Sequence, residues 1–107
     1  MTRGEVLRLV GEFRRGLAAL YGTRLKGVYL YGSYARGQAD EGSDIDVAVV
    51  LGGAVNRAEE SRCTSELTAE LSLRENCVLV PFFLSEEEHR HTPFAIHRSI
   101  VREGVPV

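Results

Sequence analysis

The chain has 107 residues, 44% hydrophobic and 26% charged, which is the composition of a globular protein with one domain spanning residues 1–107. Thirteen Lys and Arg are dispersed among fifteen Asp and Glu, and the net charge is −2. That balance argues against long nucleic acid as a partner, because phosphate neutralisation needs a basic stripe. With no long apolar run and no basic-then-apolar leader, we expect a cytoplasmic protein with no membrane partner.

The first third of the chain predicts a helix, a strand and a loop. Thr2 and Glu5 have capping-box spacing, and apolar residues at helical spacing follow, which predicts a helix over residues 3–21. The segment "KGVYLYG" (26–32) is rich in strand-forming residues and closes on glycine. Residues 33–43 are polar and predict a loop that carries a short helical turn.

Two further strands and a helix between them are expected next. "DIDVAVVL" (44–51) has a continuous apolar part, which predicts a strand buried on both faces. Asn56 is a preferred N-cap residue, so we expect a helix to start after it and to end near Arg74. "CVLVPFFL" (77–84) is a third strand, and its Pro81 favours an edge position or a bulge.

The last segment predicts helix starts at two places. Ser85 and Glu88 have capping-box spacing, and Thr92-Pro93 is expected to start the final helix, which Gly104 ends. Four residues of that helix are expected to face inward: Phe94, His97, Ile100 and Val101.

The element order is therefore α-β-β-α-β-α. The crossover of about 25 residues between the second and third strands allows them to run parallel, whereas the first two strands are expected to be antiparallel. The predicted fold class is α/β, a small mixed sheet flanked by helices.

Asp44 and Asp46 stand at the head of a buried strand. Side chains two apart on a strand share a face, so Ile45 and Val47 point to the other side. Two carboxylates ~5 Å apart repel by roughly 3 kcal/mol at an effective dielectric near 20. A fold keeps such a pair if it is solvated, shares a proton or is bridged by a cation. Oxygen ligands at an open site suit Mg²⁺, with Mn²⁺ as the alternative ion.

Gly32-Ser33 enters a turn at the end of the first strand. Glycine allows a phosphate to approach the backbone, and the amide and hydroxyl of Ser33 can donate to phosphate oxygens. Taken alone, a Gly-Ser turn after a strand more often has no binding role. Taken alone, a pair of acids at a strand start is more often a solvated strand end or forms a salt bridge with a residue such as Arg36. Together, these features predict a metal-bound triphosphate between the turn and Asp44 and Asp46.

Gly32-Ser33, followed after ten residues by Asp44-x-Asp46, resembles the signature of the nucleotidyltransferase superfamily that includes DNA polymerase beta. The segment "GSYARGQADEGSDIDVAVV" is similar to the sequences of the minimal members of that superfamily, the MNT-domain proteins. The resemblance implies a polymerase beta-type fold, two Mg²⁺ ions, and transfer of a nucleoside monophosphate from an NTP such as ATP, with release of pyrophosphate.

The resemblance also assigns roles to residues of the motif. Asp44 and Asp46 would be the catalytic metal ligands, and Gly32 and Ser33 would hold the triphosphate. Three more residues join the candidate nucleotide site: Tyr34 as a contact to the base, Arg36 as a phosphate contact or a brace of the loop, and Ser43 as the cap of the turn before the strand.

MNT proteins that resemble this chain are commonly encoded beside a HEPN-domain protein. In such pairs the HEPN protein is a toxic ribonuclease, and the MNT protein is an antitoxin that can transfer AMP from ATP to a partner tyrosine. The resemblance therefore implies a protein adenylyltransferase whose acceptor belongs to another protein, or to a second copy in a homo-oligomer.

The sequence departs from the family in the third strand, where a third carboxylate usually stands. "CVLVPFFL" contains no acid, and Glu75 and Asn76 lie just before it. The alternative reading is therefore an MNT-fold binding module that neutralises its partner by complex formation, with little or no catalysis. A small-molecule transferase is a third reading, for which the sequence shows no acceptor pocket.

Cysteines and histidines offer no clear second site. Cys63 and Cys77 lack metal-ligand spacing and are expected to be reduced core residues. His89 and His91 do not share a helix face and are expected on the surface.

Overall fold

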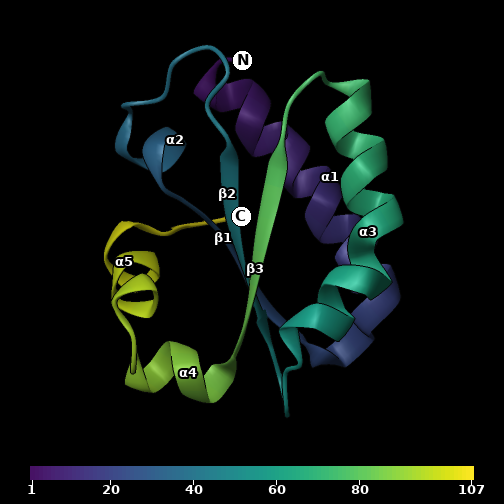
Figure 1. Ribbon diagram of the computed structural model, residues 1–107, viewed down its shortest axis with the longest axis vertical. Helices are drawn as coiled ribbons and strands as arrows, with labels where there is room; N and C mark the ends of the chain where they lie inside the picture. The colour runs from purple at the N-terminus through teal and green to yellow at the C-terminus, as the bar shows by residue number, and fades with distance from the viewer.

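The computed structural model describes residues 1–107 and shows a four-stranded mixed sheet with helices on both faces (Figure 1). The elements in chain order are α1 (Arg3–Tyr21), η1 (Gly22–Arg24), β1 (Leu25–Tyr31), α2 (Ser33–Arg36), β2 (Ile45–Leu51), α3 (Arg57–Arg74), β3 (Leu79–Ser85), α4 (Glu86–His91), α5 (Ala95–Glu103) and β4 (Val105–Pro106). None of the helices is both long enough and apolar enough to cross a membrane.

The strands lie in the order β3-β2-β1-β4. β1 and β2 are antiparallel, and β2 and β3 are parallel across the helical crossover, as the sequence predicts. β3 is an edge strand, which confirms the inference from Pro81. The sequence does not predict β4, a two-residue strand that pairs with Tyr29 and Leu30 of β1.

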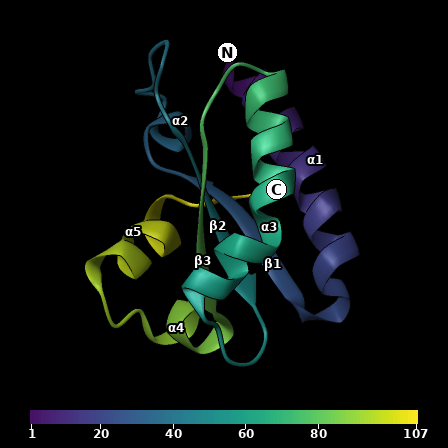
Figure 2. The ribbon, with the colours of Figure 1, turned by 45° about the vertical axis from the view of Figure 1, so that its right-hand side comes forward.

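One face of the sheet is covered by α1 and α3, which lie together on the same side in Figures 1 and 2. The capping box of Thr2 and Glu5 starts α1, and the apolar stripe of this helix packs in the main core. Ile45, Val47, Val49 and Leu51 of β2 belong to the same core and are completely buried. The other residues of β2 therefore face the opposite side.

The opposite face is covered only in part. α4 and α5 lie over its lower half in Figure 1, where Ala48 and Val50 pack with Leu84 and Ile100. Towards the start of β2 no helix crosses the sheet, and α2 lies beside that region. The part of the face that follows the predicted acid pair is thus open.

The final helix differs from its prediction at its start. α5 begins at Ala95, because Thr92 adopts a left-handed conformation that ends α4, and Phe94 is extended. His97 and Ile100 are buried as expected, whereas Phe94 and Val101 are 64% and 53% exposed. Phe94 precedes the helix, and no neighbouring element covers the side of α5 on which Val101 lies.

The cysteines are both free, which confirms the absence of a disulfide. The expectation that both are core residues is wrong for Cys63, which is exposed on α3, and Cys77 is only half-buried. In α3 the buried positions are Glu60, Thr64 and Leu71. Cys63 is adjacent in sequence to the buried Thr64 but lines an open hollow with Leu20 and Tyr21, so helical phase decides its exposure.

Candidate nucleotide and metal site

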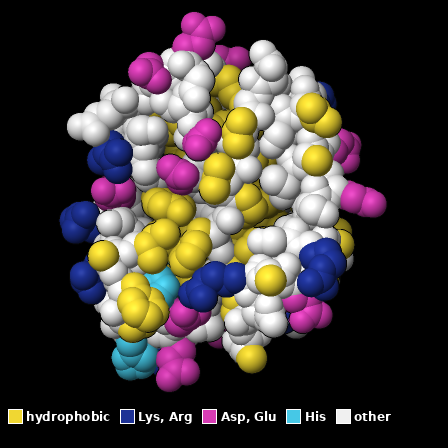
Figure 3. Space-filling view, viewed as in Figure 1, with side chains coloured by type: hydrophobic (Ala, Val, Ile, Leu, Met, Phe, Trp, Pro, Cys, Tyr) yellow, Lys and Arg dark blue, Asp and Glu magenta, His cyan; other side chains and the backbone are white.

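The two aspartates are placed as the strand pattern predicts. Asp44 is exposed and immediately precedes β2, and Asp46 lies within β2 and is half-buried. Ile45 and Val47 are completely buried on the opposite side, so Asp44 and Asp46 occupy the open face. Figure 3 shows this face, where acidic side chains stand at the upper end of a group of hydrophobic ones.

Gly32 brings a turn against Asp46. Its φ of 78° and ψ of −154° lie in a region that is essentially restricted to glycine. A Cβ atom at this position would overlap Oδ2 of Asp46 and lie 3.1 Å from its Cγ. The sequence-predicted pairing of the glycine turn with the acid strand is therefore a close physical contact.

The short helix α2 follows Gly32 directly. The amide of Arg36 donates to the carbonyl of Gly32 at 3.1 Å, which closes its single turn. The amides of Ser33 and Tyr34 precede that first bond and have no acceptor within the turn, as at any helix start. Ser33 therefore presents an amide and a hydroxyl beside Asp46.

A hollow of about 390 Å³ joins these residues. It is lined by Tyr31, Gly32, Ser33, Arg36 and Asp46, together with Ile96, Ser99 and Glu103 of α5. Four predicted site residues thus meet in one place. Asp44 is not part of this lining, but its charge acts on Asp46.

The charge of Asp46 is poorly compensated. Burial is the main cause that raises the pKa of Asp46, the Asp44 carboxylate raises it further, and the Arg36 guanidinium opposes both. Burial, together with the charge of Asp46, also raises the pKa of the neighbouring Tyr31 to about 12. Asp46 makes no ion pair, so a bound cation would relieve the cost of its ionisation.

The family model for the nucleotidyltransferase domain matches residues 10–103. The chain belongs to this family. A candidate protein adenylyltransferase of Methanocaldococcus jannaschii is 33% identical to this nucleotidyltransferase over 98 residues, which cover 91% of this chain and 92% of the relative.

Solved structures show the same fold. A candidate nucleotidyltransferase from Sulfolobus solfataricus matches with a TM-score of 0.72 at 24% identity, over 97% of this chain and 80% of that one. A chain in the complex of a tri-AMPylated Shewanella oneidensis HEPN toxin with its MNT antitoxin matches with a TM-score of 0.53 at 18% identity, over 97% of this chain and 66% of that one. The predicted fold class is therefore confirmed, including the likeness to MNT proteins.

Arg36 is held at the rim of the hollow in this nucleotidyltransferase. Its Nε donates to Oε1 of Gln38 at 2.9 Å, and its Nη1 lies 3.1 Å from Oε2 of Glu103. The bond to Glu103 ties α2 to α5, and the bond to Gln38 holds the side chain of Arg36 in the loop. Both bonds favour the interpretation that Arg36 braces the loop over the interpretation that its guanidinium is free to bind phosphate.

Ser43 and Tyr34 lie away from the hollow. The Ser43 hydroxyl accepts from the amide of Asp40 at 3.0 Å and donates to Oδ1 of Asp40 at 2.9 Å, so Ser43 closes the turn before β2. Tyr34 is only 7% exposed and packs in the main core. Both residues line a different hollow, beside Glu75 and Asn76. The structure does not bring the predicted Tyr34 and Ser43 to Asp46.

β3 places no acid beside Asp46, and Glu103, the other acid that lines the hollow, is paired with Arg36. Val80 is its partner in the parallel register of β2 and β3 and is 37% exposed on the same face. Glu75 accepts a hydrogen bond from Nε of Arg74 at 3.2 Å. No group of three His, Cys, Asp or Glu side chains is arranged to hold a metal ion. The candidate protein ligands are therefore Asp44 and Asp46 alone.

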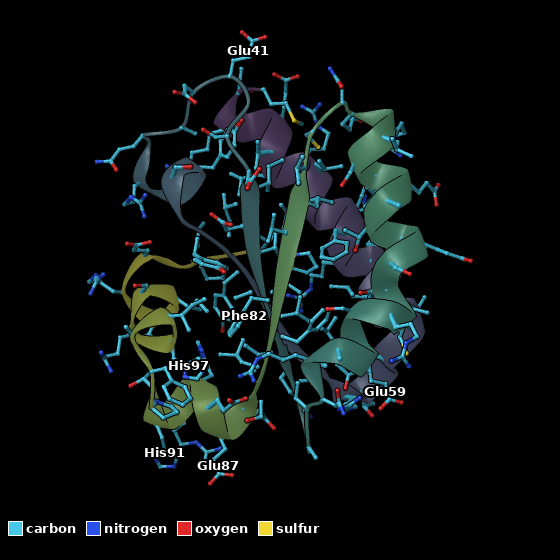
Figure 4. The ribbon with its side chains drawn as sticks, in the orientation of Figure 1. Glu41, Glu59, Phe82, Glu87, His91 and His97 are labelled. Carbon is cyan, nitrogen blue, oxygen red and sulfur yellow. The ribbon has the colours of Figure 1, made fainter.

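The histidines lie at the far end of the molecule. Figure 4 shows His91 and His97 on α4 and α5, opposite Glu41 in the loop before β2. His91 is exposed as expected, but His89 is half-buried because its ring stacks on Tyr29 with 5.2 Å between centroids. None of these residues lines the hollow beside Asp46.

Sequence reasoning missed the residues that complete the hollow. Tyr31 precedes Gly32 and pairs with Asp46 in the antiparallel register, so a register prediction for β1 and β2 could have found it. Ile96, Ser99 and Glu103 come from α5, and no local motif marks them. They reach the site because the chain returns to β1 through β4.

Proposed function

We propose that Asp44 and Asp46 bind Mg²⁺, with Mn²⁺ as a substitute, and that the Gly32–Ser33 turn binds the triphosphate of ATP beside it. The observation that carries this proposal is the contact between Gly32 and Asp46, which leaves no room even for a Cβ atom. The donor set fits the ion, because two carboxylates on an open face are the oxygen ligands that Mg²⁺ accepts along with water and phosphate.

The chain's own residues supply positioning. The Ser33 amide and hydroxyl donate to phosphate oxygens, and the Arg36–Glu103 pair keeps α2 and α5 in place around the hollow. When bound, Mg²⁺ would supply Lewis-acid stabilisation of the phosphate charge. Tyr31 stays protonated at neutral pH, since its pKa is about 12, and its hydroxyl can donate a hydrogen bond at the site.

The proposed reaction transfers AMP to a hydroxyl group of a partner protein. The hydroxyl oxygen forms a bond to the α-phosphorus, the bond from that phosphorus to the oxygen bridging to the β-phosphate breaks, and pyrophosphate leaves. The hydroxyl proton passes to solvent. The open sheet face around Asp44 gives a macromolecular acceptor access to this point.

The partner that we propose is a HEPN-domain protein, with this chain as its antitoxin. Support comes from the likeness to the MNT antitoxin complex, in which the HEPN toxin is AMPylated, and from the relative described as a protein adenylyltransferase. A second candidate function is neutralisation by binding alone. Val80 favours this second function, because an apolar side chain stands beside Asp46 on the strand where the family usually has a third carboxylate.

The deciding experiment incubates the purified protein with its purified HEPN-domain partner, Mg²⁺ and ATP labelled at either the α- or the γ-phosphate. We expect the partner to gain the α-label and not the γ-label, and we expect Asp44→Asn and Asp46→Asn to abolish this gain. Glu41→Gln is the matched control, since Glu41 is an exposed acid of the same loop without an ion pair. Partner inhibition without any α-label would support the binding module instead.

A further inference from the structure

An apolar strip runs from the acid pair to the start of α5. It consists of Val78, Val80, Phe82, Ile96 and Phe94. Val80 and Phe82 alternate along β3 and share the face of Asp46, and Val78, which directly precedes β3 and accepts from the amide of Ile45, continues the alternation. The strip contains four of the eight exposed large hydrophobic residues of the chain. Figure 3 shows hydrophobic side chains gathered here, between β3 and α5.

The strip is continuous rather than scattered. The Phe82 and Phe94 rings both contact His97, with centroids 6.0 and 5.6 Å away. Ile96 lines the same hollow as Asp46, and Val80 is the register partner of Asp46. Contiguous exposed apolar surface marks interaction sites, and a molecule that covers this strip would also lie beside Asp46.

The free edge of β3 offers few amide donors for strand addition. The bond from the Ile45 amide to the Val78 carbonyl directs the backbones of residues 78, 80, 82 and 84 towards β2. Of the outward positions, Pro81 has no amide hydrogen, the Leu79 amide donates to Ser72 Oγ at 3.1 Å, and the Ser85 amide donates to Glu88 Oε1 at 3.0 Å. Among the outward positions, this leaves the amide of Phe83 as the donor for an added strand, which favours a partner that docks on the face of the sheet through side chains.

The charges around the strip restrict the partner. At the end beside the acid pair, Glu41 and Asp44 are exposed and have no ion-pair partner. A bound nucleotide would add negative phosphate charge at the same end. A segment that approaches this end gains from carrying Lys or Arg. A second copy seated on the strip would instead bring its own acids and cover both sites.

We propose that the apolar strip is the docking surface of the acceptor protein. The inference rests on the proposed AMP transfer and specifies its partner. The docking segment presents an apolar face to Val78, Val80 and Phe94, with a basic residue beside the acceptor hydroxyl at the Asp44 end. Side-chain packing sets the affinity, and the charges set the direction in which the segment lies.

The test compares two strip variants, Val78→Ser and Phe94→Ser, with Leu20→Ser on α1. Leu20 and Val78 are both 55% exposed, so the control replaces a hydrophobic residue of the same fractional exposure away from the strip. Binding of the purified HEPN-domain partner is measured with Mg²⁺ and a non-hydrolysable ATP analogue. Hydrogen exchange of the unmodified complex provides a footprint that depends on no variant.

We expect each strip variant to weaken partner binding at least tenfold and to raise the KM for the acceptor, while ATP binding and Leu20→Ser stay unchanged. Exchange should slow at residues 78–82 and 94–96. Strip-specific loss of binding without AMP transfer would retain the docking surface and refute the proposed function. Equal effects of all three variants, a footprint elsewhere, or strip variants that change only self-association would overturn the docking proposal.

Discussion

Replacing Gly32 by alanine tests the contact on which the site is built. Gly32 has a backbone conformation that costs other residues about 1–3 kcal/mol. The new Cβ must also displace the Asp46 carboxylate, and overpacking of this kind costs about 1–3 kcal/mol more. The total, roughly 2–6 kcal/mol, is a large part of the ~5–15 kcal/mol that stabilises a typical domain.

Gly37→Ala is the matched control. Gly37 also has a positive φ, 73°, but nothing lies within 4 Å of its added Cβ. Gly37→Ala should therefore lose only the stability that its backbone conformation costs an alanine, about 1 kcal/mol, which lowers the Tm of a domain of this size by about 4 °C. Urea denaturation of both variants gives the difference between them.

A double-mutant cycle with Asp46→Ala isolates the contact itself. Removing the Asp46 carboxylate should recover about 1–3 kcal/mol of the Gly32→Ala loss, because the overlapping atoms are gone. It should recover none of the Gly37→Ala loss. If Gly32→Ala is no more costly than Gly37→Ala, or if the cycle shows no coupling with Asp46, the reasoning about this site is refuted.

Three further predictions concern the charges of the site. Because the pKa of Asp46 is raised in the folded protein, ionisation of Asp46 lowers the stability of the fold as pH rises through the ordinary and then the raised pKa. Without metal, Asp46→Asn should therefore have a higher Tm than wild type at pH 7 and lose this advantage near pH 3. The variant should gain no stability from Mg²⁺. Val80→Asp should tighten Mn²⁺ binding measured by calorimetry, whereas Val80→Asn should not; equal affinities would disprove the placement of a third ligand there. If Arg36 is a brace, Arg36→Gln and Glu103→Gln should weaken ATP binding equally, each changing stability by only about 0–1 kcal/mol; a far larger loss for Arg36→Gln would show a phosphate contact.

Local signals in the sequence predict most of the framework. The capping boxes at Thr2 and Ser85 mark two helix starts that the structure confirms. The buried run of β2 and the length of the crossover correctly predict which strands are parallel. These features depend on residues close together in the chain, and for that reason they can be read without a structure.

What the sequence does not predict depends on long-range packing. Tyr34 follows Ser33 in the motif, but α2 turns its ring into the main core, away from the hollow. Tyr31 belongs to the site only through its register with Asp46. The contribution of α5 requires the chain to return along β1 by way of β4, a strand too short to leave a pattern.

The most direct test of the central claim is a titration of Mn²⁺ followed by electron paramagnetic resonance, with and without ATP. Free Mn²⁺ gives a signal that is lost on binding, so the measurement reports the ion itself and needs neither partner nor turnover. We predict that the wild-type protein binds Mn²⁺ more tightly with ATP than without it, and that Asp44→Asn and Asp46→Asn lose this binding while Glu41→Gln retains it. Equal binding by all four proteins would contradict a metal and nucleotide site at Asp44, Asp46 and the Gly32–Ser33 turn.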